Sequence, residues 1–450
     1  MKGHDRWDYA PYLPFDRRSE RFDPYICRLA PSENALEAQW FAPESDSLSA
    51  TVYYAVRGTE AWRSLSVSGD EFTISGLETD TDYALYLVDA AGRRSRTRLF
   101  RTGEVPGVVV NYLHPDDEYY AFSGRYLCSP CILKLESGRL LASMDVHAGA
   151  RPQNLTLIFA SDDGGAHWRY LTEIMPAFWG RMFQHRGRLF MLAISGEYGD
   201  VLLGESKDEG KTWCTPVVIA RGASIPQENG FHRAPMPFIG HAGRLWSGIE
   251  YGSWTNRIHS DMLISIAADA EPMDVSNWVI SEALRPDPAW PGAAFGIEGN
   301  AVVGPDGVLY DFLRYGENRA LVLRKDVSDP DAALEFDHFA EFPLAHTKFE
   351  LQKRGDVYYA VGNPVPARRV LSVFVSRDLV NWERVLDVID YSHMDVKEVG
   401  FQYPAFTFDG DDLLILSRTA CNRAHNFHDS NYSTFHRVTP KGLCPFGNPA

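Results

Sequence analysis

Two segments of this chain share a short turn motif, and that motif constrains the fold more than any other feature of the sequence. The segments read SDDGGAHW at residues 161–168 and SKDEGKTW at 206–213, and both fit S-x-D-x-G-x-x-W. In such a turn the Asp accepts hydrogen bonds from its own backbone, the Gly adopts a positive φ, and the Trp packs against a neighbouring unit. A shortened copy without the Gly reads SRDLVNW at 376–382. Three copies predict a repeat fold.

A second repeated phrase predicts the number and extent of the units. Six segments combine a Gly-containing turn with an apolar strand, and they lie at 136–142, 185–191, 241–247, 305–311, 353–359 and 409–415. This pattern is typical of a hairpin inside a four-stranded unit, so we expect six blades over residues 107–438. The strand predicted at 108–113 precedes the first unit. We expect it to join the last blade and close the ring, which removes a free sheet edge.

The residues before the repeats predict a separate small domain. Residues 25–103 alternate apolar and polar side chains in short runs, which favours a β-sandwich. Leu77 and Tyr83 have the spacing of a tyrosine corner, and Trp40 supplies a core indole, so this region resembles a fibronectin type III domain. Residues 1–24 are interpreted as an N-terminal extension and 439–450 as a C-terminal tail. We expect no catalysis in the sandwich.

Composition excludes several classes of partner. A formal net charge of −16 over 450 residues argues against a nucleic-acid partner. No apolar run approaches the roughly 18 residues of a membrane span. The first residues contain no apolar leader, so the sequence as written predicts a cytoplasmic protein, with secretion as the alternative if a leader was trimmed. The six cysteines are scattered, and we expect free thiols.

The turn motif is the Asp box, and the chain resembles the sialidase-type β-propellers. The predicted fold class is therefore all-β, a six-bladed sialidase-like propeller preceded by a small fibronectin III-like sandwich. Asp boxes stabilise blades and perform no chemistry, so they indicate fold and not function. In this arrangement both kinds of turn lie on one face of the ring. The other face, which we call the strand-start face, carries the beginnings of the inner strands and the loops after the second strands, where propellers concentrate function.

Polar and aromatic side chains gather at the predicted strand-start face. Charged groups rarely converge on an axis without a ligand, although any single one of them could be a rim salt bridge. The catalytic candidates from this placement are His232, at a strand start, and His147, in a loop. The substrate-binding candidates are Arg181, Arg233 and Gln402 at strand starts and Tyr251 and Arg418 in the loops.

The resemblance implies roles for four further residues. Sialidases hold a carboxylated sugar with three arginines, use a Tyr as nucleophile and a Glu to activate it, and use an Asp as acid and base. Glu298 and Arg314 match the positions of the family's Glu and of one Arg in IEGNAVVGPDGVLYDFLR. Arg368 (or Arg369) follows an Asn-Pro pair before the worn Asp box and matches another Arg. Tyr403 begins the last inner strand and matches the nucleophile.

Two parts of the family pattern are missing from this chain. The family's first Arg lies in an R-x-P motif, and this chain reads CSP at residues 128–130. The acid/base Asp belongs in the first blade's outer loop, which reads HAGARPQN at 147–154 and contains no carboxylate. We therefore expect an incomplete carboxylate clamp and a replaced proton donor, with His147 as the candidate.

These departures favour one of three hypotheses. The first is a glycan-degrading enzyme, a glycoside hydrolase or a uronate lyase, that acts exo-wise on an acidic or deoxy-sugar oligosaccharide. In its lyase form an Arg neutralises the uronate while Tyr or His removes the proton beside it. The second is a true exo-sialidase with a modified arginine clamp. The third is a non-catalytic propeller that binds a glycan or a protein.

One loop has the spacing of a metal site. Cys421, His425 and His428 follow one another like zinc ligands. They predict a structural zinc, with calcium as the other ion considered, and no cofactor is expected to be required. The alternative is a polar loop bonded to itself through turn-forming residues.

Overall fold

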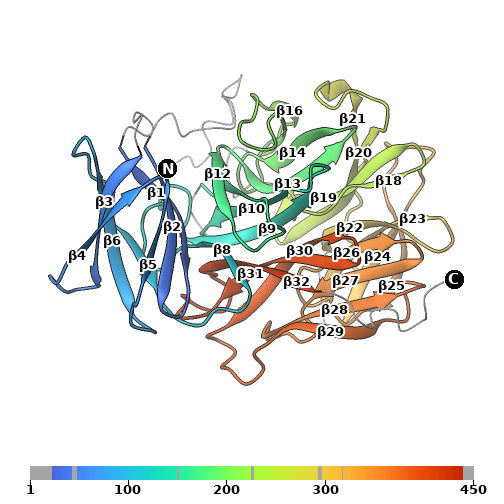
Figure 1. Ribbon diagram of the computed structural model, residues 1–450. Helices are drawn as coiled ribbons and strands as arrows, with labels where there is room; N and C mark the ends of the chain where they lie inside the picture. Colours follow the sequence, from blue (N-terminus) through green and yellow to red (C-terminus); the bar gives the residue numbers. More distant parts are fainter. Residues whose placement is uncertain are drawn as a thin grey trace.

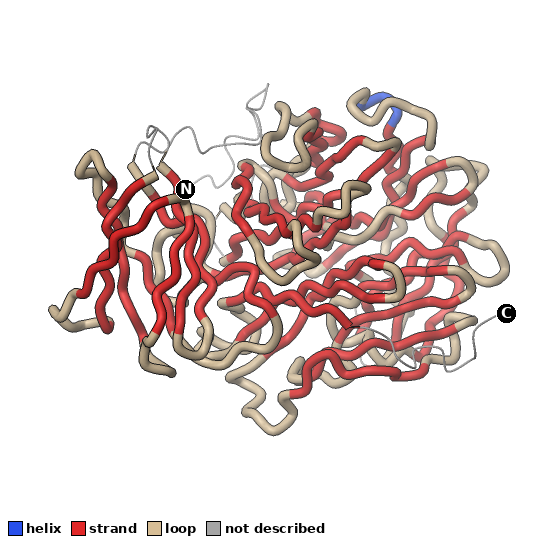
Figure 2. Tube along the Cα trace, viewed as in Figure 1, coloured by secondary structure: helices blue, strands red, loops and turns tan. Residues whose placement is uncertain are grey.

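The protein is built almost entirely from β-strands in a computed structural model that describes residues 23–42, 48–148, 152–223, 228–291, 296–316 and 318–438. Figure 1 shows a small domain, in blue, beside a larger ring of sheets. In the described ranges the helical element is the 3₁₀ turn η3 (Val275–Asn277), which is the short blue stretch in Figure 2. No helix among the described residues is long and apolar enough to cross a membrane. The extension predicted at 1–24 and the tail at 439–450 fall almost wholly outside these ranges.

The small domain is a sandwich of two antiparallel sheets. One sheet has the order β1 (Tyr25–Pro31), β2 (Ala35–Phe41) and β5 (Glu71–Ser75). The other has the order β4 (Arg63–Ser68), β3 (Ser49–Val56), β6 (Asp82–Asp89) and β7 (Arg98–Arg101). Trp40 is fully buried between them, and the Tyr83 hydroxyl accepts a hydrogen bond from the Glu78 N–H at 2.9 Å. The assignment to the fibronectin type III family stays a prediction.

Six further sheets follow in chain order, and we number them as ring sheets one to six. Sheet one contains β9 (Tyr126–Lys134), β10 (Leu140–His147), β11 (Thr156–Ser161) and β12 (Arg169–Ile174). Sheet two contains β13 (Phe178–His185), β14 (Arg188–Ile194), β15 (Val201–Ser206) and β16 (Val217–Ala220). Sheet three contains β17 (Gly230–His232), β18 (Ile239–His241), β19 (Arg244–Ser253), β20 (Ile258–Ala267) and β21 (Trp278–Ile280).

The remaining three sheets complete the ring. Sheet four contains β22 (Ile297–Val303), β23 (Leu309–Gly316), β24 (Arg319–Lys325) and β25 (Glu335–Glu341). Sheet five contains β26 (Glu350–Arg354), β27 (Val357–Gly362), β28 (Val370–Ser376) and β29 (Glu383–Asp390). Sheet six contains β30 (Gly400–Asp409), β31 (Asp412–Ala420), β32 (Tyr432–Val438) and β8 (Val108–Tyr112).

The ring closes through both backbone pairing and packing. Strand β8, from the beginning of this domain, pairs antiparallel with β32 from its end, so the last sheet takes its outer strand from the first segment. The first strands of the sheets lie innermost and contact one another, and β30 of sheet six packs against β9 of sheet one. This closure satisfies strand edges that would otherwise be open to pairing with another chain.

The repeated turn motif adopts the same hydrogen bonds in its two complete copies. In the first copy Gly165 N–H donates to the Ser161 hydroxyl at 2.9 Å, and Trp168 Nε1 donates to the Gly165 carbonyl at 3.1 Å. The second copy repeats these bonds at 2.8 and 3.1 Å. In the worn copy Leu379 replaces the Gly and adopts a φ of 63°, a conformation that is strained for a residue with a Cβ.

The sandwich and the ring share one interface. A single apolar cluster runs from sandwich residues such as Trp40 to ring residues such as Phe401 and Tyr432. The Gln39 side chain accepts from Tyr170 N–H at 2.7 Å and donates to the carbonyl of the same residue at 3.3 Å. The interface packs the sandwich against sheets one and six of the ring.

Candidate active site

Four inner strands carry a β-bulge at the same place, near their beginnings. The bulges interrupt the pairing of β9, β13, β22 and β30 with their second strands. Each contains a residue with positive φ, at 50° for Ser129, 52° for Trp179, 60° for Glu298 and 51° for Tyr403. Left-handed conformations of such residues cost about 1–3 kcal/mol each and concentrate at functional sites, and bulges re-aim side chains. The two residues matched to the family's catalytic pair therefore occupy equivalent bulges.

Each second strand has a residue that pairs with the inner strand directly before the bulge. The pairs, with the second-strand residue first, are Asp145–Cys128, Ile194–Phe178, Arg314–Ile297 and Arg418–Gln402. In sheet three, where the inner strand is split into β17 and β18, Glu250 pairs with His232 before the break. Four of these five second-strand positions are charged, and they stand beside the bulges.

Tyr403, Glu298 and Arg314 come together. The Arg314 Nη1 atom donates to the Tyr403 hydroxyl at 3.3 Å and lies 3.1 Å from Glu298 Oε2. Burial alone would lower the pKa of Arg314, but Glu298 and Tyr403 beside it raise that pKa above its ordinary value. Arg314 therefore stays charged, and its Nη1 atom contacts both Glu298 and Tyr403.

Two more guanidinium groups lie over the ring of Tyr403. The Cζ atom of Arg418 is 5.2 Å from the ring centroid, and that of Arg368 is 5.7 Å from it. The buried Gln402 side chain accepts a hydrogen bond from Arg368 and donates to the Phe427 carbonyl at 2.7 Å. Burial lowers the pKa of Arg368, and the neighbouring Arg314 and Arg418 lower it further. In the described part of the chain neither Arg368 nor Arg418 forms an ion pair, although Glu298 interacts electrostatically with Arg368 and Asp429 with Arg418. The site therefore gathers three guanidinium groups around Tyr403.

His232 is linked to this cluster through Glu250. The Glu250 Oε2 atom lies 2.7 Å from His232 Nδ1, while its Oε1 accepts from the Gly299 N–H at 3.0 Å, directly beside Glu298. Asp145 repeats the arrangement in sheet one, where it accepts from the Trp179 N–H at 2.7 Å in the bulge of sheet two. In both cases a carboxylate on the second strand of one sheet accepts a hydrogen bond from the backbone of the inner-strand bulge in the next sheet.

Three other predicted residues lie away from the Tyr403 cluster. Arg233 is fully buried and donates to the Leu192 and Met236 carbonyls and to Ser247, so it supports the fold below the site. Arg181 is also buried and pairs with Glu350 at 3.3 Å. Tyr251 is 37% exposed and packs edge-on against Phe231.

His147 does not have the properties of the expected proton donor. Its ring stacks on Phe178 and lies 6.1 Å from the His428 ring. Burial, together with the positive charge of Arg418, lowers the pKa of His147 to about 3. The imidazole is therefore neutral at neutral pH and has no acidic proton of the kind a glycosidic oxygen needs.

Glu197 is a carboxylate that the sequence places at the strand-start face but to which the resemblance gave no catalytic role. It follows β14 in the loop after the second strand of sheet two and is half-buried. The Gln153 Nε2 atom donates to its Oε2 at 2.6 Å. Burial raises the pKa of Glu197 above its ordinary value, against a lowering by this hydrogen bond and by His232. The sequence did contain a signal, because the loop at 147–154 lacks the expected carboxylate and a neighbouring loop could supply one. The family pattern places the acid in sheet one, so the resemblance did not point to sheet two.

The structure does not bring the predicted metal ligands together. Cys421 is buried and its backbone N–H donates to Asn431, His425 packs on the Tyr126 ring, and His428 pairs with Asp429 at 2.9 Å. Among the described residues no group of three His, Cys, Asp or Glu side chains is placed to hold a metal ion. These contacts fit the alternative interpretation, a polar loop bonded to itself through turn-forming residues. The five described cysteines are free thiols.

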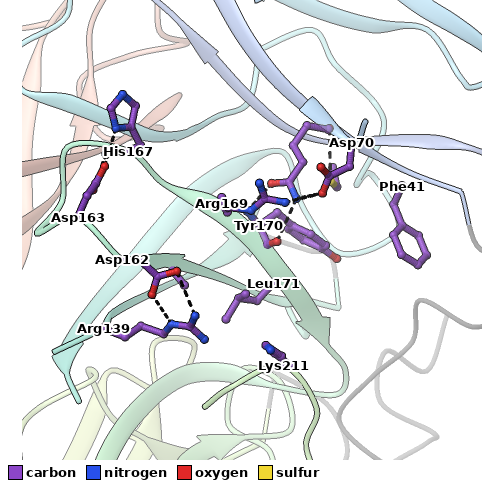
Figure 3. Close-up of a pocket in the computed structure, with 13 residues that line it drawn as sticks. Phe41, Asp70, Arg139, Asp162, Asp163, His167, Arg169, Tyr170, Leu171 and Lys211 are labelled. Atoms are coloured by element: carbon purple, nitrogen blue, oxygen red, sulfur yellow. Dashed lines mark hydrogen bonds and ion pairs between the residues drawn. The ribbon is translucent and has the colours of Figure 1, made fainter. Parts of the chain in front are cut away.

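A hollow of about 540 Å³ lies elsewhere, between the sandwich and the outer strands of sheet one. Figure 3 shows that charged side chains in it pair with one another, with Arg169 on Asp70, Arg139 on Asp162 and His167 on Asp163. Of these pairs only Arg169–Asp70 joins the sandwich to the ring, and the Tyr403 cluster is not part of the lining of this hollow.

Comparison with known proteins identifies the fold. No protein-family model matches the chain, and no curated protein matches it. Among solved structures, an α-L-arabinanase from Penicillium chrysogenum complexed with arabinobiose matches 75% of this chain and 99% of its own, with a TM-score of 0.53 and 14% identity. A Hadza microbial sialidase matches 96% and 99%, with a TM-score of 0.52 and 15% identity. A leech intramolecular trans-sialidase matches 95% and 93%, with a TM-score of 0.50 and 11% identity. At these identities the likeness shows the fold, which is the sialidase-like propeller predicted from the Asp boxes.

Proposed function

We propose that this protein is a glycoside hydrolase that removes a carboxylate-bearing sugar from an oligosaccharide. The observation that carries the proposal is the contact of one Arg314 nitrogen with both the Tyr403 hydroxyl and the Glu298 carboxylate. The sialidase-like fold supports it, since the similar solved structures include an arabinanase and two sialidases.

The three groups suit nucleophilic catalysis at an anomeric carbon. A phenol is a weak nucleophile until an adjacent base takes its proton, and Glu298 is the carboxylate held beside Tyr403. Arg314 stabilises the phenolate oxygen as it forms, because it donates to that oxygen. The Tyr403 oxygen then bonds to the anomeric carbon while the glycosidic oxygen leaves, and water later releases the sugar.

The preference for an acidic sugar rests on the guanidinium groups. Arg314, Arg368 and Arg418 surround one tyrosine in a protein whose net charge is −16. Guanidinium–carboxylate contacts are among the strongest hydrogen bonds available in a partly desolvated site. A uronate or a sialate supplies the missing negative charge, whereas a neutral deoxy sugar does not.

A specific observation also favours the sialidase alternative. The Cys128 thiol, which stands where the family has its first Arg, interacts electrostatically with Arg418. Arg418 belongs to sheet six, and in this alternative it supplies the third positive charge that the sequence of sheet one lacks. A clamp of Arg314, Arg368 and Arg418 suits a sialoside as well as a uronide.

A panel of aryl glycosides tests the proposal. We expect release of the aryl group from a sialoside or a glucuronide, and much weaker release from a rhamnoside or an arabinofuranoside. Uronate oligosaccharides followed at 235 nm separate a lyase, whose unsaturated product absorbs there, from a hydrolase. Turnover confined to neutral sugars would contradict the acidic-sugar proposal. Binding of these sugars without turnover would favour the non-catalytic propeller.

A further inference from the structure

We infer that Glu197 is the general acid that protonates the departing glycosidic oxygen, in the place of the family's acidic residue in the first blade. The inference rests on the proposed function, because it assigns a step of the same reaction. It depends on the contacts between two neighbouring loops, one from sheet one and one from sheet two.

The loop that lacks a carboxylate reaches one in the next sheet. Gln153 lies in that loop, is 1% exposed and adopts a φ of 50°. Its amide donates to Glu197 at 2.6 Å across 44 residues of sequence. The neighbouring blade thus brings a carboxyl group to the loop where the resemblance expects one.

Glu197 belongs to the same face as the Tyr403 cluster. The Cys128 thiol interacts electrostatically with Arg418 and with Glu197, and Arg418 lies over the Tyr403 ring. Glu197 also interacts with His232, which Glu250 ties to the backbone beside Glu298. Glu197 therefore interacts electrostatically with groups that are themselves linked to Tyr403 and to the backbone beside Glu298.

The surroundings of Glu197 raise the pKa of its carboxyl group and so favour its protonated form. The titratable groups that interact with it are His232 from β17, Cys128 from β9 and Tyr198 beside it in the chain, and Gln153 is a neutral donor. No Lys or Arg pairs with Glu197 in the described ranges of the chain. Burial therefore dominates and favours the protonated form.

The other acidic or basic groups nearby are committed elsewhere. Asp145 is 1% exposed and accepts from Thr156 and from the Trp179 N–H, so it holds a bulge. Asp429 pairs with His428. His147 is neutral for the reason given above. Glu197 is half-buried and forms no ion pair in the described part of the chain.

The proton and bond changes balance in two steps. In the first step the Glu197 proton passes to the glycosidic oxygen as its bond to the anomeric carbon breaks, while Tyr403 bonds to that carbon and gives its proton to Glu298. In the second step Glu197 removes a proton from water, whose oxygen bonds to the carbon. The Tyr403–sugar bond breaks, and Glu298 returns the proton to the tyrosine.

The test compares leaving groups in Glu197→Gln, because an acid is needed most when the departing oxygen is strongly basic. The probes are a dinitrophenyl glycoside and a methyl glycoside of the sugar that the aryl panel identifies. We expect kcat/KM to fall at least about 100-fold on the methyl glycoside and less than about tenfold on the dinitrophenyl glycoside. The alkaline limb of the kcat/KM profile on the methyl glycoside should also disappear.

The matched control is Glu136→Gln, an exposed Glu in a turn of the opposite face, which should leave both substrates unaffected. Equal losses on the two glycosides, or no loss on either, would overturn the assignment of Glu197. Tyr403→Phe separates the two proposals, since it should abolish turnover of both glycosides. If Tyr403→Phe retains activity, the proposed function fails, whereas a failure confined to Glu197→Gln leaves that function intact.

Discussion

Arg314 and Arg418 hold the same register position in two different sheets, because each pairs with the residue directly before the bulge of its inner strand. Arg314 donates to the hydroxyl of Tyr403, and Arg418 lies over the ring of the same residue. The repeat therefore supplies two arginines to one tyrosine from equivalent places. A clamp can be assembled in this way although the family's first Arg is missing.

Arg418→Lys tests the role of this guanidinium in carboxylate binding. Lys keeps the charge but loses the planar set of donors. We expect KM for the acidic sugar to rise about tenfold or more, since a charged hydrogen bond contributes about 1.5–3 kcal/mol. The methyl ester of the same sugar has no charge to lose and should be affected much less. Equal effects on the acid and the ester would contradict the assignment.

Gly299→Ala tests the fit behind Glu298. A Cβ at residue 299 would lie 2.4 Å from Oδ1 of the buried Asp311, so the bulge must move. We expect a lower Tm and a large loss of kcat. Gly240→Ala is the matched control, because a Cβ there meets nothing within 4 Å. If both variants behave like the native protein, the bulge is not as constrained as described.

Asp145→Asn tests the pH dependence of stability. Burial raises the pKa of the Asp145 carboxyl to about 7, whereas an unfolded Asp titrates near 4. The folded protein then binds this proton more tightly, so its contribution to stability is complete below about pH 4 and is lost as the pH rises to about 7. The variant should gain stability relative to the native protein between pH 5 and pH 8, measured by urea unfolding. An unchanged difference at the two pH values would exclude this effect.

His147→Ala tests the proton donor that the sequence alone suggested. Because the pKa of His147 lies near 3, we expect its removal to leave the alkaline limb of the kcat/KM profile in place. Activity should fall by less than about tenfold, through lost packing on Phe178. A loss as large as that of Glu197→Gln would restore His147 as the acid.

The fold and the centre of the site could be predicted because they depend on local patterns. The turn motif carries its own hydrogen bonds within eight residues, as the Ser161–Gly165 and Trp168–Gly165 contacts show. Tyr403 and Glu298 could be placed because each begins an inner strand, and strand starts share one face of the ring. The resemblance then supplied their roles.

The rest of the site depends on contacts between blades, which a linear pattern does not encode. Gln153 meets Glu197 because two outer loops lie side by side. Arg233 and Arg181 occupy strand-start positions as expected, but packing turns them into the interior. Cys421, His425 and His428 have suitable spacing, yet the loop directs them to separate partners.

The most direct test of the account is the turnover of an acidic aryl glycoside by Tyr403→Phe, with Tyr54→Phe in the sandwich as control. The substitution removes one oxygen and keeps the ring beneath Arg368 and Arg418, so thermal unfolding should not change. We expect kcat/KM to fall at least about 100-fold for Tyr403→Phe and to stay unchanged for Tyr54→Phe. Retention of most of the activity by the folded Tyr403→Phe protein would contradict the assignment of the nucleophile and of the reaction built around it.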